Sequence, residues 1–361
     1  NPPMEYLDGT KNDHYEILES RFNNEILNKN ISLLDVSKID SPIMCSKDVE
    51  SSCSSLFELG IRLVVPMQIK QKTKGLILLG ERNTEESFSK SDIEFVASVG
   101  SLAIISIENS LLFKEALEKQ RLEKDLEIAK KIQKKLLPSK LPIMQRFEIA
   151  AYNSAAKQVG GDYYDAIKLE DGRVLIAIAD VSGKGVQAAL LMANLQAFLQ
   201  SISKQNKELS DASNLLNDLV SENTSDGRFI TFFWGILNDK TLEFESVNMG
   251  HNPPLLIRNG KILKLKLGGM LMGVMPTVTP YKKEITTLFK DDALILFTDG
   301  ITEAMNEDDD EFSDEKLEEL ALTYSDLSAQ ESLTHILNEV NQHTNGTEQS
   351  DDITCIVVKV K

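Results

Sequence analysis

The second half of the chain alternates short apolar runs with turn signals. Asp171-Gly172 and Asn259-Gly260 are dipeptides that favour tight β-hairpin turns, and each lies between two runs of strand length. A third pair of runs surrounds residues 238–240. The pattern predicts strands at 147–154, 163–169, 173–179, 229–237, 242–248, 255–258, 261–265, 293–298 and 353–360. Because hairpins join antiparallel neighbours, we expect antiparallel sheets.

Helical spacing appears between these strands. Residues 186–204 and 212–223 form two central helices in this interpretation, and shorter segments at 317–322 and 333–342 form a late one. Apolar sheets of this size need helices to cover them. We therefore expect an α+β fold in which helices flank two stacked antiparallel sheets, an αββα sandwich.

The first half has a simpler pattern. Two β-rich runs at 61–69 and 74–79 predict a hairpin, the Ser-rich residues 40–55 predict a loop, and Ser89 to Asp92 offer helix N-caps. The helical pattern then continues to Pro138 and Pro142, where we expect it to end. The expected domains are residues 1–112, a helical linker at 113–142, and residues 143–361.

The linker carries a short apolar stripe with coiled-coil spacing. Its members recur at steps of three and four residues: Leu122, Leu126, Ala129, Ile132 and Leu136. Two interpretations stay open. The helix lies on its own domain, or it pairs with a second chain or transmits a signal.

Composition narrows the class of protein. The 361 residues suffice for two domains, and the formal net charge of -17 argues against nucleic-acid binding. Three cysteines without metal-ligand spacing favour a reducing compartment, so we expect a cytoplasmic protein. No apolar run approaches the roughly 20 residues that span a bilayer, so we expect no membrane segment. The chain begins at Asn1 rather than Met, which leaves segments upstream open.

One stretch combines a strand, a carboxylate and a glycine-bracketed turn, Asp180-Val-Ser-Gly-Lys-Gly185. A P-loop is excluded, because Gly185 follows Lys184 where Ser or Thr belongs, and Ile178 stands in place of the first Gly. The dinucleotide fingerprint fits the glycines better. However, Asp180 would repel a pyrophosphate, and an antiparallel hairpin follows where that fold needs a parallel strand.

A cation site is the third interpretation of this turn. Three further acidic sites lie at predicted strand ends: Asp162 with Asp165, Asp299, and Asp351 with Asp352. Clustered carboxylates repel unless cations lie between them, and oxygen ligands select Mg²⁺ or Mn²⁺ over zinc. Two such ions activate water and clamp a phosphoryl oxygen. Spacing alone does not prove that the sites converge.

The acidic motifs, taken together, resemble the metal-dependent (PPM-type) protein phosphatases, in particular their sporulation-phosphatase-like (SpoIIE-like) branch. The resemblance covers about residues 147–361, and residues 129–138 are similar to the linker helix that precedes this domain. The matching motifs are Val159-Gly-Gly-Asp-Tyr-Tyr-Asp165, Asp180-Val-Ser-Gly-Lys-Gly185, Asn248-Met-Gly-His-Asn-Pro-Pro254, Phe297-Thr-Asp-Gly-Ile-Thr-Glu-Ala304 and Asp351-Asp-Ile-Thr354.

This resemblance implies a serine/threonine phosphatase with two Mn²⁺ or Mg²⁺ ions, whose bridging water attacks phosphorus directly. Asp180 would bridge the metals, with the Val181 carbonyl on one of them. Asp162 and Asp299 would join Asp180 as catalytic ligands. Asp351 completes the ligand set, and Asp352 is a further metal-ligand candidate. Asp165 and Asp352 both match acidic positions of the family that contact the metals through water or through another ligand, or that have a structural role only. Two further residues are considered. Lys157 is either a substitute for the phosphate-binding Arg of other members or, as we expect, a solvated surface residue, and His251 is a structural residue near the site.

Residues 14–112 resemble the later part of a GAF sensor domain, through Gly75-Leu-Ile-Leu-Leu-Gly80, Phe88-Ser-Lys-Ser-Asp-Ile-Glu-Phe95 and the following helix. The resemblance implies sensor control through the linker and a homodimer formed by the linker and this domain. The substrate it implies is a phosphorylated STAS-type anti-sigma-factor antagonist. Two alternatives stay open: an inactive phosphatase-like binding module, and a phosphohydrolase of a small metabolite.

Overall fold

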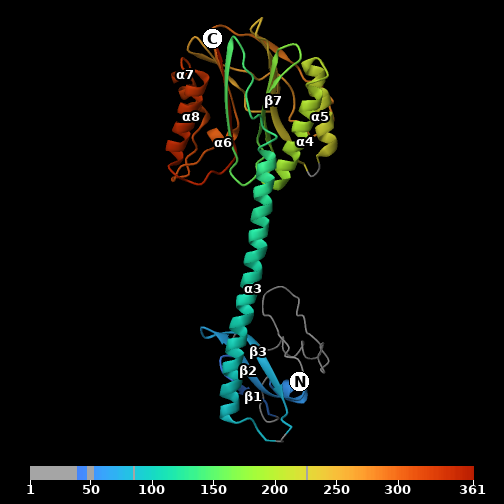
Figure 1. Cartoon of the computed structure of the whole chain (residues 1–361), viewed down its shortest axis with the longest axis vertical. Coiled ribbons are helices and arrows are strands. Elements are labelled where there is room, and N and C mark those ends of the chain that lie inside the picture. The colour runs from blue at the N-terminus through green and yellow to red at the C-terminus, as the bar shows by residue number, and fades with distance from the viewer. Residues whose placement is uncertain (1–38, 47–52, 84–85, 225–226) are drawn as a thin grey trace. The chain divides into compact units, whose positions relative to one another are not determined.

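The computed structural model describes residues 39–46, 53–83, 86–224 and 227–361 (Figure 1). The chain divides into two compact units, Asn1–Leu122 and Glu123–Lys361. One long helix, α3 (Lys90–Gln133), contributes residues to both units. The predicted helix and the linker as far as Gln133 are therefore one continuous helix, which ends before the expected stop at Pro138 and Pro142.

The first unit contains a small antiparallel sheet with the strand order β1-β2-β3. Its elements are β1 (Ile43–Met44), α2 (Cys53–Glu58), β2 (Ile61–Ile69), β3 (Lys72–Gly80) and the start of α3. The predicted hairpin is confirmed as the β2–β3 pair. The loop predicted at 40–55 is wrong in part, because β1 pairs with β2 and α2 begins at Cys53. Residues 1–38 of the GAF-like stretch lie outside the described residues.

The second unit contains two five-stranded antiparallel sheets. The first has the order β10-β9-β12-β13-β4, and the second has the order β11-β8-β7-β6-β5. Their strands are β4 (Phe147–Ser154), β5 (Tyr163–Lys168), β6 (Val174–Val181), β7 (Ile230–Leu237), β8 (Glu243–Met249), β9 (Leu255–Arg258), β10 (Lys261–Lys264), β11 (Glu284–Thr287), β12 (Ala293–Phe297) and β13 (Ile353–Val360).

Helices cover the outer faces of both sheets. Figure 1 shows α4 (Val186–Ile202) and α5 (Leu209–Asn223) on one side of the strands, and α7 (Asp314–Thr323) and α8 (Ala329–Thr344) on the other. A four-residue helix, α6 (Asp299–Thr302), follows β12. The expected αββα sandwich is confirmed. The sequence pattern missed β11 and α6, because each spans four residues and, unlike the equally short β9 and β10, neither lies beside a hairpin-turn dipeptide.

Alternation along the central strands explains the layers. In β6, Leu175, Ala177 and Ala179 face the core that α4 and α5 cover. The residues between them, Ile176 and Ile178, face the core between the sheets. Both faces of this strand are therefore buried, and the carboxylate of Asp180 comes where this apolar run ends.

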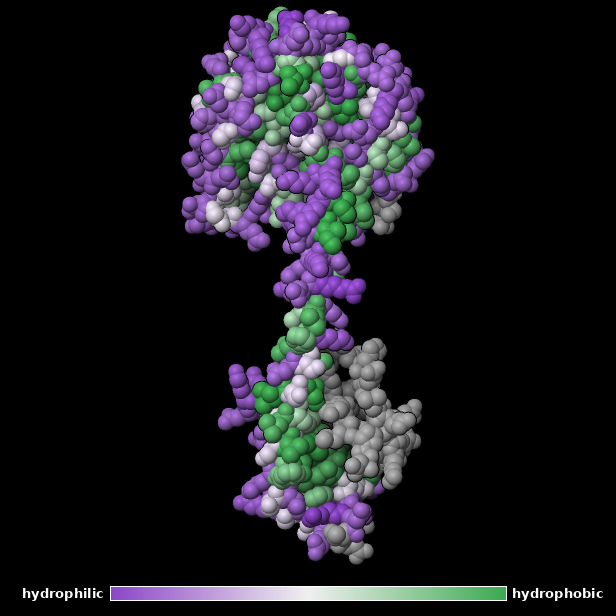
Figure 2. All heavy atoms as spheres, viewed as in Figure 1, coloured by the Kyte–Doolittle hydropathy of each residue, from purple (hydrophilic) through white to green (hydrophobic). Residues whose placement is uncertain are grey.

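Helix α3 exposes many apolar side chains. Figure 2 shows apolar surface on the first unit, and the exposed apolar residues of α3 are Phe95, Val99, Leu102, Ile105, Leu111, Leu112, Phe113, Leu117, Leu122, Ile128 and Ile132. By length and composition, an 18-residue stretch of α3 is apolar enough to cross a membrane, and little of it is buried. The sequence analysis did not find this stretch because it counted contiguous apolar residues, whereas this helix mixes apolar and small residues. Helices in the core of soluble proteins have similar compositions.

Candidate metal centre

The strand-end carboxylates lie at one end of the sandwich. Asp180 is the penultimate residue of β6, and Asp162 immediately precedes β5, whose first residue pairs with Ala179. In the other sheet, Phe297 at the end of β12 pairs with Cys355 near the start of β13. Antiparallel pairing thus places Asp299 beside the segment before β13. The fold brings together sites more than a hundred residues apart in the sequence.

Asp162 links the two sheets directly. Its Oδ2 accepts hydrogen bonds from the hydroxyl groups of Thr298, at 2.8 Å, and Thr354, at 2.6 Å. Both threonines are fully buried, and the amide of Thr354 also donates to the hydroxyl oxygen of Thr298. The sequence analysis included both threonines in its motifs but gave them no role. Their hydroxyls fix the orientation of the Asp162 carboxylate.

The carboxylates at this end repel one another. Burial raises the pKa of Asp180 to about 7, and the charges of Asp299 and Asp351 add to the increase. The pKa of Asp162 is raised well above its ordinary value, first by burial and then by the charge of Asp180. Burial and the charge of Asp351 likewise raise the pKa of Asp299. These shifts indicate an acidic cluster that lacks enough positive charge.

Lys184 is a cation that contacts this cluster. Its Nζ lies 2.8 Å from Oδ2 of Asp351 and donates to the Ser350 carbonyl at 2.9 Å. The glycines on either side, Gly183 and Gly185, have φ values of +94° and +80°, which favour glycine and turn the chain sharply here. The sequence analysis considered Lys157 instead, but that residue is exposed and the described contacts place Lys184 at the acidic cluster.

Asp352 organises the loop that carries Asp162. Its carboxylate accepts the backbone N–H groups of Ala156, Gly161 and Asp162, at 2.8, 2.6 and 3.2 Å. A Cβ at Gly160 would lie 2.0 Å from Oδ2 of Asp352, so only glycine permits this approach. The glycine pair therefore serves the contact between the loop and this carboxylate.

Asp165 has a different environment. Its carboxylate accepts hydrogen bonds from the Tyr163 hydroxyl, the Ala166 amide and the Gln200 side chain. Burial is the main cause that raises its pKa, and no charge of the acidic cluster contributes to the shift. Through Gln200 this carboxylate ties β5 to α4.

His251 is buried close to the acidic end. Its Nδ1 lies 2.9 Å from the hydroxyl of Thr231, and Thr231 pairs with Asp180 across β6 and β7. The side chain of Asn248 holds the turn, since it accepts from the His251 amide and donates to its carbonyl. Burial lowers the pKa of His251 to about 4, so the ring is neutral at physiological pH.

The donor set suits a hard divalent cation. The Val181 carbonyl oxygen faces Gly161, next to Asp162 in the chain, since a Cβ at Gly161 would lie 2.8 Å from it, and a carbonyl oxygen is also a ligand of such cations. Within the described ranges, no three His, Cys, Asp or Glu side chains come close enough to hold a metal ion as they stand. The residues thus fit the cation in type, burial and charge.

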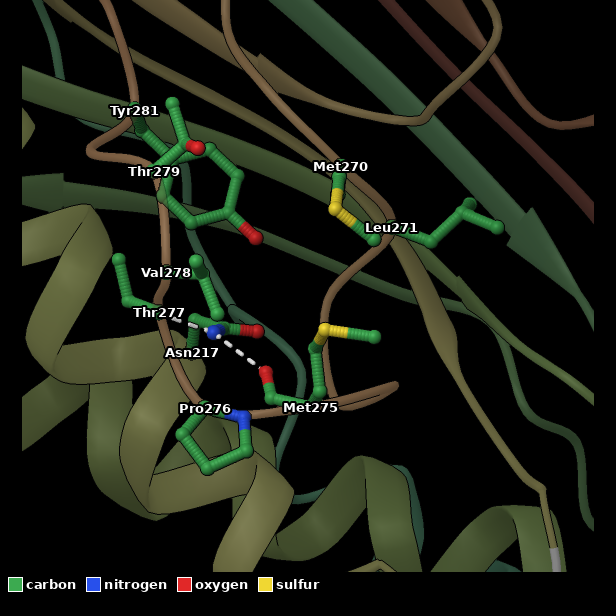
Figure 3. Close-up of a pocket in the computed structure, with 9 residues that line it drawn as sticks. All are labelled: Asn217, Met270, Leu271, Met275, Pro276, Thr277, Val278, Thr279 and Tyr281. Carbon is green, nitrogen blue, oxygen red and sulfur yellow. Dashed lines mark hydrogen bonds between the residues drawn. The ribbon is translucent and has the colours of Figure 1, made fainter.

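A small cavity between α5 and the loop before β11 lies apart from these carboxylates (Figure 3). Its volume is about 20 Å³, and Met270, Leu271 and Val278 contribute to its lining. Asn217 spans it by donating to the Met275 carbonyl and to the Thr277 hydroxyl. The cavity has room for about one water molecule and is no substrate site.

The chain is similar in sequence to one protein family and to several known proteins. The family model of stage II sporulation protein E (SpoIIE) matches residues 170–361, more than half of the chain. The chain belongs to the SpoIIE family. It is 31% identical over 245 residues to the phosphoserine phosphatase RsbU of Bacillus subtilis, covering 67% of this chain and 72% of that protein. It is 30% identical over 262 residues to the protein IcfG of a Synechocystis strain, covering 65% and 41%.

Solved structures of PP2C phosphatases share the fold of this SpoIIE family member. The SiaA-PP2C domain of Pseudomonas aeruginosa matches with a TM-score of 0.59 and 17% identity, over 68% of this chain and all of that one. The PP2C domain of Bacillus subtilis SpoIIE, solved with a regulatory fragment, matches with a TM-score of 0.53 and 22% identity, over 61% and 64%. These likenesses show that the chain contains the PP2C fold.

Proposed function

We propose that this protein hydrolyses phosphoserine or phosphothreonine in a protein substrate with the help of two divalent cations, Mn²⁺ or Mg²⁺. One observation carries the proposal. Asp180 is partly buried and is repelled by Asp299 and Asp351, and together these effects raise its pKa to about 7. A protein retains such an arrangement at a cost in stability, and a bound cation removes that cost.

The cations would be held by oxygen ligands from four segments. These ligands are Asp162, Asp180, the Val181 carbonyl, Asp299 and Asp351. Asp352 joined this set in the sequence analysis, but its oxygens already accept three backbone N–H groups. We therefore assign Asp352 to holding the loop of Asp162, and Asp165 to joining β5 with α4.

Bound divalent cations lower the pKa of water and polarise a phosphoryl oxygen. The chain itself orients the ligands. Thr298 and Thr354 fix the Asp162 carboxylate, and the neutral His251 supports Thr231 opposite Asp180. Lys184 is half-exposed beside Asp351, so its ammonium can turn from this carboxylate toward a phosphoryl oxygen.

The substrate proposal draws on the relatives. RsbU and RsbP of Bacillus subtilis are both named phosphoserine phosphatases, and RsbP is 24% identical over 245 residues. Asp351 and Lys184 are partly exposed, so the site is open enough for a side chain presented by another protein. We propose a STAS-type anti-sigma-factor antagonist as the substrate.

We further propose that the protein is cytoplasmic and that residues 1–112 form a GAF-like sensor. The apolar stripe of the linker supports pairing with a second copy, because Leu122 and Ile132 are exposed along α3. Pairing would bury these side chains and connect the sensor to the phosphatase.

Phosphate release from purified phosphoproteins tests this function. STAS-type proteins phosphorylated on serine, phosphotyrosine peptides and p-nitrophenyl phosphate would each be incubated with the enzyme and Mn²⁺ or Mg²⁺. We expect the phosphoserine protein to give the highest kcat/KM. Equal or higher turnover of a small phosphate ester would support the metabolite phosphohydrolase, and no turnover of any substrate would support the binding module.

A further inference from the structure

A larger cavity lies where α4 ends and α5 begins. Its volume is about 370 Å³, and it borders both the turn between β5 and β6 and the loop that joins the two helices, residues 203–208. Cavities of this size hold small organic molecules in other proteins. Asp180 lies near the other end of β6, about 17 Å along the strand from Leu175, so this cavity is separate from the candidate metal centre.

The floor of this cavity is apolar. It is one end of the core that α4 and α5 cover, and its side chains are Leu175, Ile202, Leu209, Trp234 and Ile236. Trp234 is held in place, because its Nε1 donates to the Ser213 hydroxyl at 2.9 Å. The indole therefore has no polar hydrogen left for a ligand. These five side chains offer a bound molecule apolar contact only.

The rim of the same cavity carries three cations, Arg173, Lys204 and Lys207. Arg173 donates from Nε to Oδ2 of Asp171 at 2.7 Å, and its two terminal nitrogens have no acceptor among the described residues. Neither lysine forms an ion pair in the part of the chain that the structure describes. The carboxylates at the rim are Glu170 and Asp171, and Asp171 is already paired. The rim therefore has cationic donors to spare.

We propose that this cavity binds a small amphipathic anion, an apolar chain or ring that carries a carboxylate or phosphate group. The apolar floor selects the body of such a molecule. The guanidinium and the two ammonium groups select its head, since these groups form charge-assisted hydrogen bonds with carboxylate and phosphate oxygens. A neutral ligand leaves the rim cations unused, and a wholly polar anion leaves the floor without contact. This inference goes beyond the proposed phosphatase function and does not rest on it.

Trp234 is the only tryptophan in the chain, so its fluorescence reports on this cavity. A bromine atom quenches tryptophan fluorescence at short range. The full chain in EDTA would be titrated with 6-bromohexanoate, and 6-bromohexan-1-ol is the matched uncharged probe. We expect saturable quenching by the carboxylate with a Kd of about 1 mM, because so small a molecule binds weakly. The alcohol should bind about tenfold more weakly, because it cannot accept charge-assisted hydrogen bonds.

Two variants remove the cations from the rim. Arg173→Gln and the double variant Lys204→Gln/Lys207→Gln should each bind 6-bromohexanoate about fivefold more weakly, since each loses charged donors in partly exposed surroundings. The matched control is Lys261→Gln/Lys266→Gln, which makes the same change of charge as the lysine variant at exposed positions in β10 and just after it. We expect the control to bind as the unchanged protein does. An equal loss in the control would show a general effect of charge and overturn the site.

Competition identifies the head group. Hexanoate, hexyl phosphate and hexan-1-ol carry no bromine, and each would be added to the complex with 6-bromohexanoate. Recovery of fluorescence with either anion and not with the alcohol supports the proposal, and the more effective anion gives the preferred head group. Quenching that does not saturate, equal binding of the brominated alcohol, or unchanged binding in both rim variants would overturn the proposal. If Arg173→Gln does not fold, the lysine variant decides alone.

Discussion

Asp180→Asn should make the metal-free protein more stable, although it removes the central ligand. The reason lies in the buried acidic cluster. The pKa of Asp180 is raised from its ordinary 3.8 to about 7, with burial as the first cause and the charges of Asp299 and Asp351 next. At neutral pH and above, the folded state therefore holds a charge that it disfavours. Asparagine has nearly the same shape and no charge.

The magnitude follows from the pKa. A difference of about three pH units corresponds to about 4 kcal/mol as an upper limit, at about 1.4 kcal/mol per unit. Asp180 is only partly buried, so solvent screening reduces this figure, and we expect a gain of about 1–2 kcal/mol at pH 8. Because folding raises the pKa of this acid, ionisation of Asp180 lowers the free energy of unfolding. The destabilisation develops as pH rises from about 4 to about 7 and is complete above that range.

Urea unfolding in EDTA at pH 8 and at pH 5 measures the effect. We expect Asp180→Asn to exceed the unchanged protein in unfolding free energy at pH 8, and we expect the difference to shrink at pH 5. Mn²⁺ should then stabilise the unchanged protein by about 2.7 kcal/mol at a hundred times its Kd and leave the variant unaffected. Equal or lower stability of the variant at pH 8 would refute the picture of a repelling acidic cluster.

Two further predictions concern the cation beside the cluster and the linker. Lys184→Met should bind Mn²⁺ several-fold more tightly in calorimetry, because the ammonium that pairs with Asp351 no longer competes, whereas Lys157→Met should bind as before. Weaker binding in Lys184→Met would contradict this competition. Leu126→Asp should reduce self-association in sedimentation and alter the phosphatase rate, with Lys124→Asp as control. If neither quantity changes, the α3 stripe is only a spacer.

Much of the fold could be predicted because its signals are local. The Asp171-Gly172 and Asn259-Gly260 turns each identify a hairpin that the structure contains. The short elements β11 and α6 were missed, since each spans four residues and no hairpin-turn dipeptide marks it, as Asn259-Gly260 marks β9 and β10. The membrane-like composition of α3 was missed as well, because it depends on the average over a helix and not on a contiguous run.

The site was predictable in its acidic residues and less so in their partners. Asp162 and Asp180 could be predicted because each lies at the end of a strand and close to glycines. Thr354 contacts Asp162 across 192 positions of sequence, so no spacing rule relates the two. Lys184 belongs to one of the motifs quoted above. Its contacts with Asp351 and Ser350 depend on how the two sheets pack, which no local pattern encodes.

Phosphate release with and without the central carboxylate tests the account most directly. A phosphoserine protein substrate would be incubated with saturating Mn²⁺ and either the unchanged enzyme or folded Asp180→Asn, and each assay repeated in EDTA. The account predicts Mn²⁺-dependent release by the unchanged enzyme, abolished by EDTA and by Asp180→Asn. Full activity of Asp180→Asn, or release by the unchanged enzyme in EDTA, would contradict it.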